Sequence, residues 1–113
     1  TVIIFTSDHG DGNGAHQWNQ KTALYEEVVG VPMIVCLPGG RNAGTVTDAL
    51  VHNGIDLMPS ICEWTGASLP AGRRGVSYVG VAEKGAARRS IDSSSIAVRH
   101  KPLIFRDFCC IIT

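Results

Sequence analysis

Polar side chains that could do chemistry gather near the start of the chain: Asp8, His9, Asp11, Asn13, His16 and Lys21. A carboxylate followed directly by an imidazole can offer two ligands to one cation, because both side chains can face one cavity where the chain turns. Carboxylate oxygen favours Ca²⁺ or Mg²⁺, whereas imidazole is more usual with Zn²⁺ and its neighbours. The Asp8–His9 pair is therefore a candidate cation site, and the pair alone does not identify the metal.

An isolated Asp-His pair also has an ordinary interpretation, in which Asp8 caps a turn and His9 makes routine hydrogen bonds. The other metal templates are absent. The sequence has no HExxH or CxxC spacing, and Gly10 occupies the third position of an EF-hand loop counted from Asp8. Gly10, Gly12 and Gly14 match neither the dinucleotide nor the Walker phosphate motif, so we interpret them as loop geometry.

A strand leads into this group of residues. Residues 2–5 are a continuous apolar, β-prone run, and polar residues follow from Thr6 onward. This pattern is typical of α/β proteins and predicts a strand buried on both faces that ends in the loop carrying Asp8 and His9. In open α/β sheets ligands bind at the carboxyl ends of strands, so the loop stands where a site is expected.

The next elements are predicted to alternate. Residues 22–29 predict a short helix, because Leu24 and Val28 lie one turn apart, and Gly30 ends it. Residues 31–37 are again continuous and apolar and predict a second buried strand.

The second half of the chain predicts a third strand over residues 45–51 and a helix over residues 56–65. Asp56 is the expected N-cap, Pro59 lies in the expected first turn, and Gly66 is the expected C-terminal cap. The apolar stripe of this helix comprises Leu57, Ile61 and Trp64, with Met58 and Cys62 beside it.

The C-terminal part predicts a surface loop over residues 69–85 and two short strands within residues 95–105. Residues 1–56 contain two Lys+Arg and six Asp+Glu (net −4), and residues 57–113 contain eight and four (net +4). The basic half is not expected to bind nucleic acid, because its arginines lie in Gly/Ser-rich segments with little aromatic interleaving: Arg73, Arg74, Arg88 and Arg89.

Composition excludes further classes of protein. The 113 residues are 44% hydrophobic, with ten Lys+Arg and ten Asp+Glu, which is typical of a globular domain rather than a disordered chain. The longest apolar run, residues 28–37, is shorter than the roughly 18 to 20 residues of a membrane helix. The four cysteines have no CxxC spacing and are expected to be buried or free thiols rather than a disulfide framework: Cys36, Cys62, Cys109 and Cys110.

A longer string of residues closely resembles the late metal-binding segment of the sulfatase family, which belongs to the alkaline phosphatase superfamily. The string comprises TSDHG at residues 6–10, then Gly14, His16, Trp18, Lys21, Tyr25, Glu26, Glu27, Val31, Pro32 and Ile34. Asp56, Leu57, Pro59 and Gly66 are similar to the family's DLxPTxxxxxG helix, with Ser60 in place of Thr, and residues 99–105 resemble a strand near its C-terminal subdomain.

The resemblance implies an α/β fold class: a fragment of an alkaline-phosphatase-like mixed or parallel sheet with flanking helices, plus the start of a small antiparallel C-terminal subdomain. Residues 1–90 would form the C-terminal part of the catalytic domain, and residues 91–113 the start of the subdomain. The chain itself is expected to be an excised piece that begins partway through the central sheet.

The resemblance also implies roles for four residues. Asp8 and His9 would be metal ligands, usually for Ca²⁺ rather than Mg²⁺, Mn²⁺ or Zn²⁺. Lys21 matches a lysine that contacts the sulfate ester, and His16 matches a histidine that lines the pocket, so both are assigned to catalysis and substrate binding. The alternatives are a solvated lysine and a structural histidine. The implied substrate is a sulfated small molecule or glycan.

The family's nucleophile is missing from these residues. Sulfatases use a formylglycine made within a CxPxR motif, together with two early aspartates. Cys36 begins an imitation of this motif, but Gly40 stands where arginine is required, so Cys36 is rejected as the nucleophile. The isolated 113 residues are therefore expected to lack sulfatase activity and to bind divalent cations weakly.

Two other functions stay open: a phosphate or phosphonate monoester hydrolase of the same superfamily, and a non-catalytic binding domain. The resemblance alone favours a periplasmic, secreted or lysosomal location.

Overall fold

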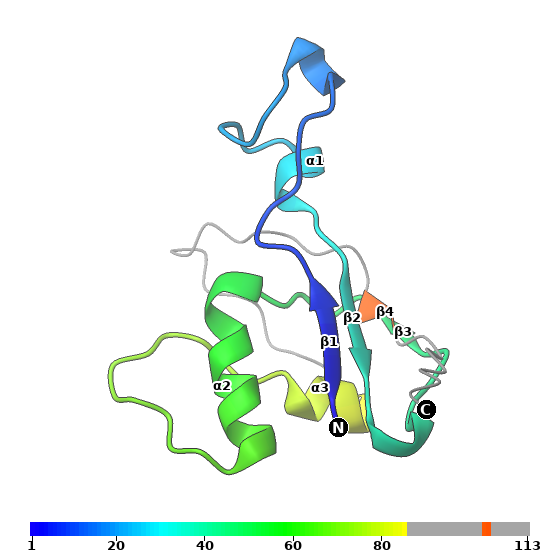
Figure 1. The fold of residues 1–113 in the computed structure, drawn as a ribbon, viewed down its shortest axis with the longest axis vertical. Helices are drawn as coiled ribbons and strands as arrows, with labels where there is room; N and C mark the ends of the chain where they lie inside the picture. The colour runs from blue at the N-terminus through cyan, green and yellow to red at the C-terminus, as the bar shows by residue number, and fades with distance from the viewer. Residues whose placement is uncertain (86–102, 105–113) are drawn as a thin grey trace.

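A computed structural model describes residues 1–85 and the backbone of residues 103–104. Its four strands are β1 (Ile3–Thr6), β2 (Met33–Cys36), β3 (Val46–Thr47) and β4 (Leu103–Ile104). They form one sheet in the order β1-β2-β4-β3, with β1 at its edge (Figure 1). β1 is antiparallel to β2, β2 is parallel to β4, and β3 is antiparallel to β4. The chain is thus a mixed α/β structure.

The predicted first strand exists, but the prediction that both its faces are buried is wrong. Its side chains alternate: Ile4 packs against the core, whereas Ile3 and Phe5 are 39% and 61% exposed. The reason is that the buried cluster lies on one face of the sheet, and no described element covers the other face of β1. β1 is a half-buried edge strand that pairs antiparallel with β2.

The helix predicted over residues 22–29 is much shorter. The helix α1 spans Glu26–Val29, with Val28 buried, while Leu24 precedes it and is 71% exposed. The segment before α1 is held instead as a loop, because the backbone N–H of Gly12 donates to the carbonyl of Gln20. Gly30 ends α1 as expected.

The long helix α2 (Asn53–Thr65) begins earlier than predicted, with His52 rather than Asp56 as its N-cap. Pro59 consequently lies inside the helix and not in its first turn. The buried face differs as well: it consists of Asn53, Asp56, Pro59 and Ser60. Of the predicted stripe, Leu57 and Trp64 pack partly against the core, whereas Ile61 and its neighbour Met58 are exposed. Gly66 is left-handed, with φ 72°, as a C-terminal cap requires.

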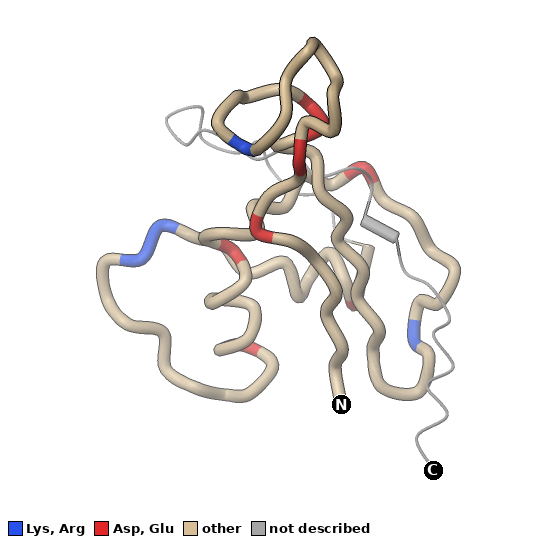
Figure 2. Tube along the Cα trace, turned by 45° about the horizontal axis from the view of Figure 1, so that its top comes forward, with Lys and Arg blue, Asp and Glu red and all other residues tan. Residues whose placement is uncertain are grey.

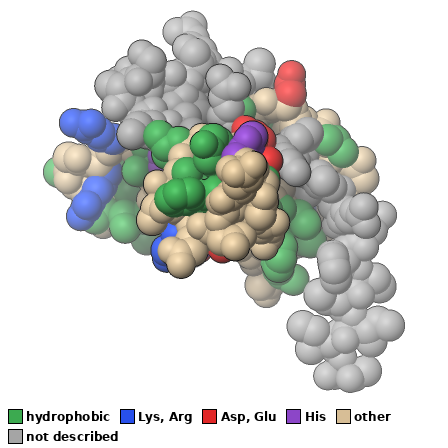
Figure 3. Space-filling model, turned by 90° about the horizontal axis from the view of Figure 1, so that it is seen from above, with side chains coloured by type: hydrophobic (Ala, Val, Ile, Leu, Met, Phe, Trp, Pro, Cys, Tyr) green, Lys and Arg blue, Asp and Glu red, His purple; other side chains and the backbone are tan. Residues whose placement is uncertain are grey.

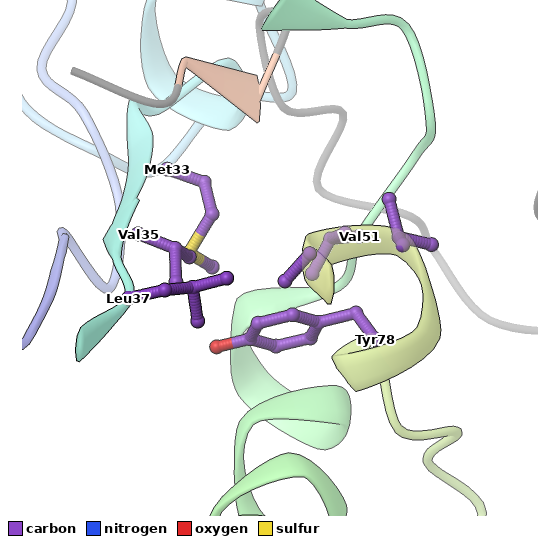
Figure 4. Close-up of a cluster of buried hydrophobic side chains, with 7 residues drawn as sticks. Met33, Val35, Leu37, Val51 and Tyr78 are labelled. Atoms are coloured by element: carbon purple, nitrogen blue, oxygen red, sulfur yellow. The ribbon is translucent and has the colours of Figure 1, made fainter. Parts of the chain in front are cut away.

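A third helix, α3 (Val79–Lys84), occupies the end of the segment predicted to be a surface loop. The apolar side chains of this helix lie in the core, where Ala82 and the N-cap residue Tyr78 are fully buried. The main hydrophobic cluster comprises Met33, Val35, Leu37, Val51, Tyr78, Val81 and Ala82, and it lies between β2, α2 and α3 (Figure 4). Trp64 of α2 meets the Tyr78 ring edge-on, with centroids 5.6 Å apart.

The other strand predictions stand as follows. β2 confirms the strand predicted over residues 31–37, and β3 confirms part of the one over residues 45–51. β4 lies within residues 95–105, and the remainder of that segment lies outside the described residues, as do Cys109, Cys110 and the proposed boundary near residue 90.

Cys36 and Cys62 are free thiols, as expected. Among the described residues, no helix is long and apolar enough to cross a membrane.

Candidate functional site

Asp8 and His9 lie in a tight turn directly after β1. The Ser7 hydroxyl donates to the His9 carbonyl at 2.7 Å, and the His9 backbone N–H donates to Oδ1 of Asp8 at 3.0 Å. These local bonds bring His9 Nε2 to 3.5 Å from Asp8 Oδ2. The two atoms are close enough for both side chains to face one cation, which is the arrangement that a shared metal site needs.

The other ring nitrogen of His9 is also engaged. Nδ1 lies 2.7 Å from the Gly10 carbonyl oxygen. A carbonyl can only accept, so Nδ1 carries the hydrogen, and in the neutral ring Nε2 then holds the lone pair. Metal-binding histidines are commonly oriented by this kind of bond to a backbone carbonyl. The donor pair therefore fits a divalent cation, with one carboxylate oxygen and one imidazole nitrogen.

The Asp8 carboxyl is suited to carry a negative charge. Desolvation raises its pKa, but the hydrogen bond from the His9 N–H and the electrostatic interactions with the His9 ring and with Lys21 outweigh it, and the pKa is lowered overall. Its side chain is 84% exposed, so a ligand can reach it. In the described part of the chain no three His, Cys, Asp or Glu side chains gather, so a cation between Asp8 and His9 would have two side-chain ligands there.

His16 and Lys21 belong to a lobe formed by residues 11–25, which projects beyond the sheet (Figure 1). The His16 ring stacks on Tyr25, with centroids 4.2 Å apart, and its Nε2 lies 3.7 Å from a carboxylate oxygen of Glu27. No hydrogen bond or ion pair within residues 1–85 joins His16 to Asp8 or His9. Lys21 is exposed and is linked to Asp8 through its charge.

Close backbone contacts hold Gly10, the residue that precedes the lobe, against α1. The Gly10 N–H donates to the Val28 carbonyl at 2.8 Å, and a Cβ at Gly10 would lie 2.0 Å from the carbonyl oxygen of Glu27. Only glycine fits there. The glycines that the sequence indicated as loop geometry thus place the Asp8 turn beside the base of the lobe.

Charged and apolar side chains meet on this lobe. Its acidic residue and its lysine, together with the glutamates of α1, lie apart from the arginine-bearing loops of the described chain (Figure 2). Seen from above, a histidine lies beside acidic side chains and an exposed apolar patch (Figure 3). The exposed apolar residues of the lobe are Trp18, Leu24 and Tyr25. Tyr25 and Glu27, the partners of His16, belong to the string that resembles the sulfatase segment, but the sequence assigned them no role in the site.

Sequence reasoning missed Asn53 entirely. This residue begins α2, is 8% exposed, and donates from its amide Nδ2 to the carbonyl oxygens of Ser7 and Asp8, the latter at 3.0 Å. The available signal was a polar amide three positions before Asp56, at the start of a helix with an apolar face.

Comparison with known proteins gives a consistent picture. The family described as "N-sulphoglucosamine sulphohydrolase, C-terminal" matches residues 14–93, which include His16 and Lys21 and begin after Asp8 and His9. An N-acetylglucosamine-6-O-sulfatase of Bacteroides thetaiotaomicron is 34% identical over 83 residues, which cover 74% of the chain and 15% of the relative. A Delta 4,5-hexuronate-2-O-sulfatase of the same bacterium is 33% identical over 79 residues, which cover 68% and 16%.

A multifunctional alkaline phosphatase superfamily protein of Trinickia caryophylli is 38% identical over 71 residues, which cover 62% of the chain and 14% of that protein. The chain thus spans about 15% of the length of these relatives. No solved structure matches the chain significantly.

Proposed function

Because the chain belongs to the sulfatase family, we propose that it forms part of a sulfuric ester hydrolase in which Asp8 and His9 hold the active-site divalent cation. The observation that carries the proposal is the facing pair of Asp8 Oδ2 and His9 Nε2, 3.5 Å apart, with the histidine oriented by the Gly10 carbonyl. Ca²⁺ is the proposed cation, ahead of Mg²⁺, Mn²⁺ or Zn²⁺. When bound, such a cation withdraws negative charge from the ester oxygens.

The chain's own residues would bind and orient the sulfate. The ammonium group of Lys21 is exposed and its charge reaches Asp8, which supports a position beside the same site. There it binds the sulfate oxygens and stabilises the negative charge that develops on them in the transition state. His16, fixed between Tyr25 and Glu27, would line the same pocket.

The nucleophile is proposed to be a formylglycine contributed by residues other than these 113, which contain no CxPxR motif. The sheet described above would then be part of a larger alkaline-phosphatase-like sheet. Among the described strands β1 pairs with β2 on one side, so its other edge can accept a further strand, which supports this. The exposed side chains of Ile3 and Phe5 support a further layer on that face of the sheet. The isolated 113 residues would be inactive.

The proposed substrate class is sulfated saccharides. Two relatives are named for sulfate esters on sugar units, N-acetylglucosamine and a hexuronate. The exposed aromatic rings of the lobe, Trp18 and Tyr25, support this choice, since such rings offer flat apolar faces beside the charged groups.

The test measures sulfate release from sulfated saccharides by the protein carrying its nucleophile, with Ca²⁺ and after chelation. We expect chelation and Asp8→Asn each to abolish release, because both remove the cation. The matched control is Asp48→Asn, which changes another exposed carboxylate outside the site. Full activity in Asp8→Asn or after chelation would refute the proposal.

The second candidate is a phosphate or phosphonate monoester hydrolase, which is favoured by the 38% identity to the multifunctional relative. Turnover of matched phosphate and sulfate esters with Ca²⁺, Mn²⁺ or Zn²⁺ separates the two. Preference for the phosphate ester with Zn²⁺ or Mn²⁺ would replace the sulfatase proposal.

A further inference from the structure

We propose that Asn53 is a positioning residue that fixes the Asp8–His9 pair for cation binding, an inference that rests on the function proposed above. Its amide Nδ2 donates to the carbonyl oxygens of Ser7 and Asp8. The Ser7 carbonyl belongs to the peptide bond between Ser7 and Asp8, and the Asp8 carbonyl belongs to the peptide bond between Asp8 and His9. One side chain thereby fixes the backbone on both sides of the first ligand.

The pair needs such support because its other hydrogen bonds are local. Asp8 and His9 are held by bonds within residues 7–10, from the Ser7 hydroxyl, the His9 N–H and the Gly10 carbonyl. The Asp8 side chain is largely in solvent. Within residues 1–85, Asn53 supplies the side-chain hydrogen bonds that reach this turn from another element.

Asn53 is itself rigidly placed. It is buried at the first position of α2, whose start is closed by two further bonds: the Gly54 N–H donates to His52 Nδ1 at 3.1 Å, and the His52 N–H donates to Asp56 Oδ2 at 2.7 Å. The other Asp56 oxygen accepts from the Val76 N–H at 2.8 Å. The turn that carries Asp8 and His9 is thus tied through Asn53 to the buried, hydrogen-bonded start of α2.

The chemistry of the amide suits this role. Its NH₂ group carries two donors, which match two carbonyl acceptors. Leucine has a similar size but no donor, and serine has one. Asn53→Leu therefore removes both bonds and Asn53→Ser keeps at most one, so the two variants give a graded test.

The experiment measures the Ca²⁺ affinity of the protein carrying its nucleophile by calorimetry, with Tb³⁺ luminescence as a second readout, and the amide NMR shifts of residues 7–10. We expect Asn53→Leu to weaken cation binding about 10- to 100-fold, as loss of an outer hydrogen bond to a metal ligand does. Asn53→Ser should fall between Asn53→Leu and the wild type, and it carries the test if Asn53→Leu does not fold.

The matched control is Ser60→Ala. Ser60 is fully buried in the same helix, donates to the Asp56 carbonyl and accepts from the Tyr78 N–H, so its loss weakens α2 without touching the ligand turn. Its Ca²⁺ affinity should equal that of the wild type. Unchanged affinity in both Asn53 variants, or equal losses in Ser60→Ala, would overturn the positioning role alone. A wild type that binds no divalent cation would instead refute the metal site, and with it the proposed function.

Discussion

Two aspartates, Asp8 and Asp56, are held in opposite ways. Asp56 is 1% exposed, and its two carboxylate oxygens accept the backbone N–H groups of His52 and Val76. Asp8 is mostly in solvent, and its Oδ2 faces the imidazole of His9. A buried carboxylate whose oxygens accept hydrogen bonds from the backbone stabilises the fold. An exposed carboxylate beside a ring nitrogen is instead accessible to a ligand such as a cation.

The regions around the two aspartates also differ in burial: the region around Asp56 is buried, and the lobe next to Asp8 is exposed. The Asp56 region packs Tyr78, Met33 and Val51 at 0% exposure. The lobe next to Asp8 exposes its apolar side chains and has left-handed backbone at several residues other than glycine: Asn13, His16, Gln17 and Gln20. Such residues are costly and persist where the surroundings impose them. Tight packing and strained, exposed backbone are therefore found in different parts of the described chain.

The largest expected effect is the loss of folding stability when the buried Asp56 is replaced. Asp56→Ala leaves the backbone N–H groups of His52 and Val76 without their acceptor, and each such loss costs roughly 1 to 3 kcal/mol. We expect the free energy of unfolding to fall by about 4 kcal/mol, measured by urea denaturation. Asp56→Asn, which keeps one acceptor oxygen, should lose less. A loss below about 1 kcal/mol for Asp56→Ala would show that the contrast between the two aspartates is wrong.

The next largest effect is expected on the catalytic rate when Lys21 is replaced. Lys21→Ala should lower kcat of the sulfatase reaction about 10²- to 10³-fold, because one charged donor to the developing negative charge is lost. The urea midpoint should not move, since Lys21 is exposed. Lys84→Ala is the matched control, because Lys84 is an exposed lysine at the end of α3. Equal rates in the two variants would remove Lys21 from the site.

A smaller effect is expected on the pH dependence of folding stability, through the buried Tyr78. Burial first, and then the charge of Asp56, raise the pKa of Tyr78 to about 12 from its ordinary value of 10. In unfolded chains the phenol ionises near pH 10, so above that pH the unfolded state binds fewer protons and stability falls until the folded phenol ionises as well. The expected loss between pH 10 and 12 is about 3 kcal/mol.

Tyr78→Phe should abolish this alkaline loss, as urea midpoints at pH 8, 10 and 12 would show. Among the described residues the buried Tyr78 hydroxyl has no hydrogen-bond partner. The variant should therefore be no less stable than the wild type at pH 8. A persistent alkaline loss in Tyr78→Phe would assign the effect to another group.

The sequence was sufficient for those features that depend on neighbours along the chain. The apolar runs predicted β1 and β2, Gly66 predicted the end of α2, and the Asp8–His9 turn was expected directly after a strand. Each depends on a few consecutive residues, whose pattern specifies local structure. These predictions are confirmed by the structure.

The features that failed depend on contacts across the chain. The buried face of α2 was assigned to apolar residues, yet it is occupied by Asn53, Asp56 and Ser60, whose partners lie in other segments. α3 was missed because its apolar residues are interrupted by glycine and become buried only against β2 and α2. Periodicity alone cannot indicate which polar side chain finds a distant partner.

The smallest expected effect on stability is that of Asp8→Asn. Its lowered pKa means that the ionised form is favoured in the folded chain, so any stabilisation is present above the unfolded value near 3.8 and is lost as the pH falls below it. Solvent screens this exposed group, and asparagine can still accept from the His9 N–H. We therefore expect equal urea midpoints for the variant and the wild type at pH 7 and at pH 3, both without added cation. Added Ca²⁺ should raise the midpoint of the wild type alone, since only a chain that binds the ion is stabilised by it. A midpoint as low as that of Asp56→Ala would make Asp8 a structural residue, and the two aspartates would no longer differ.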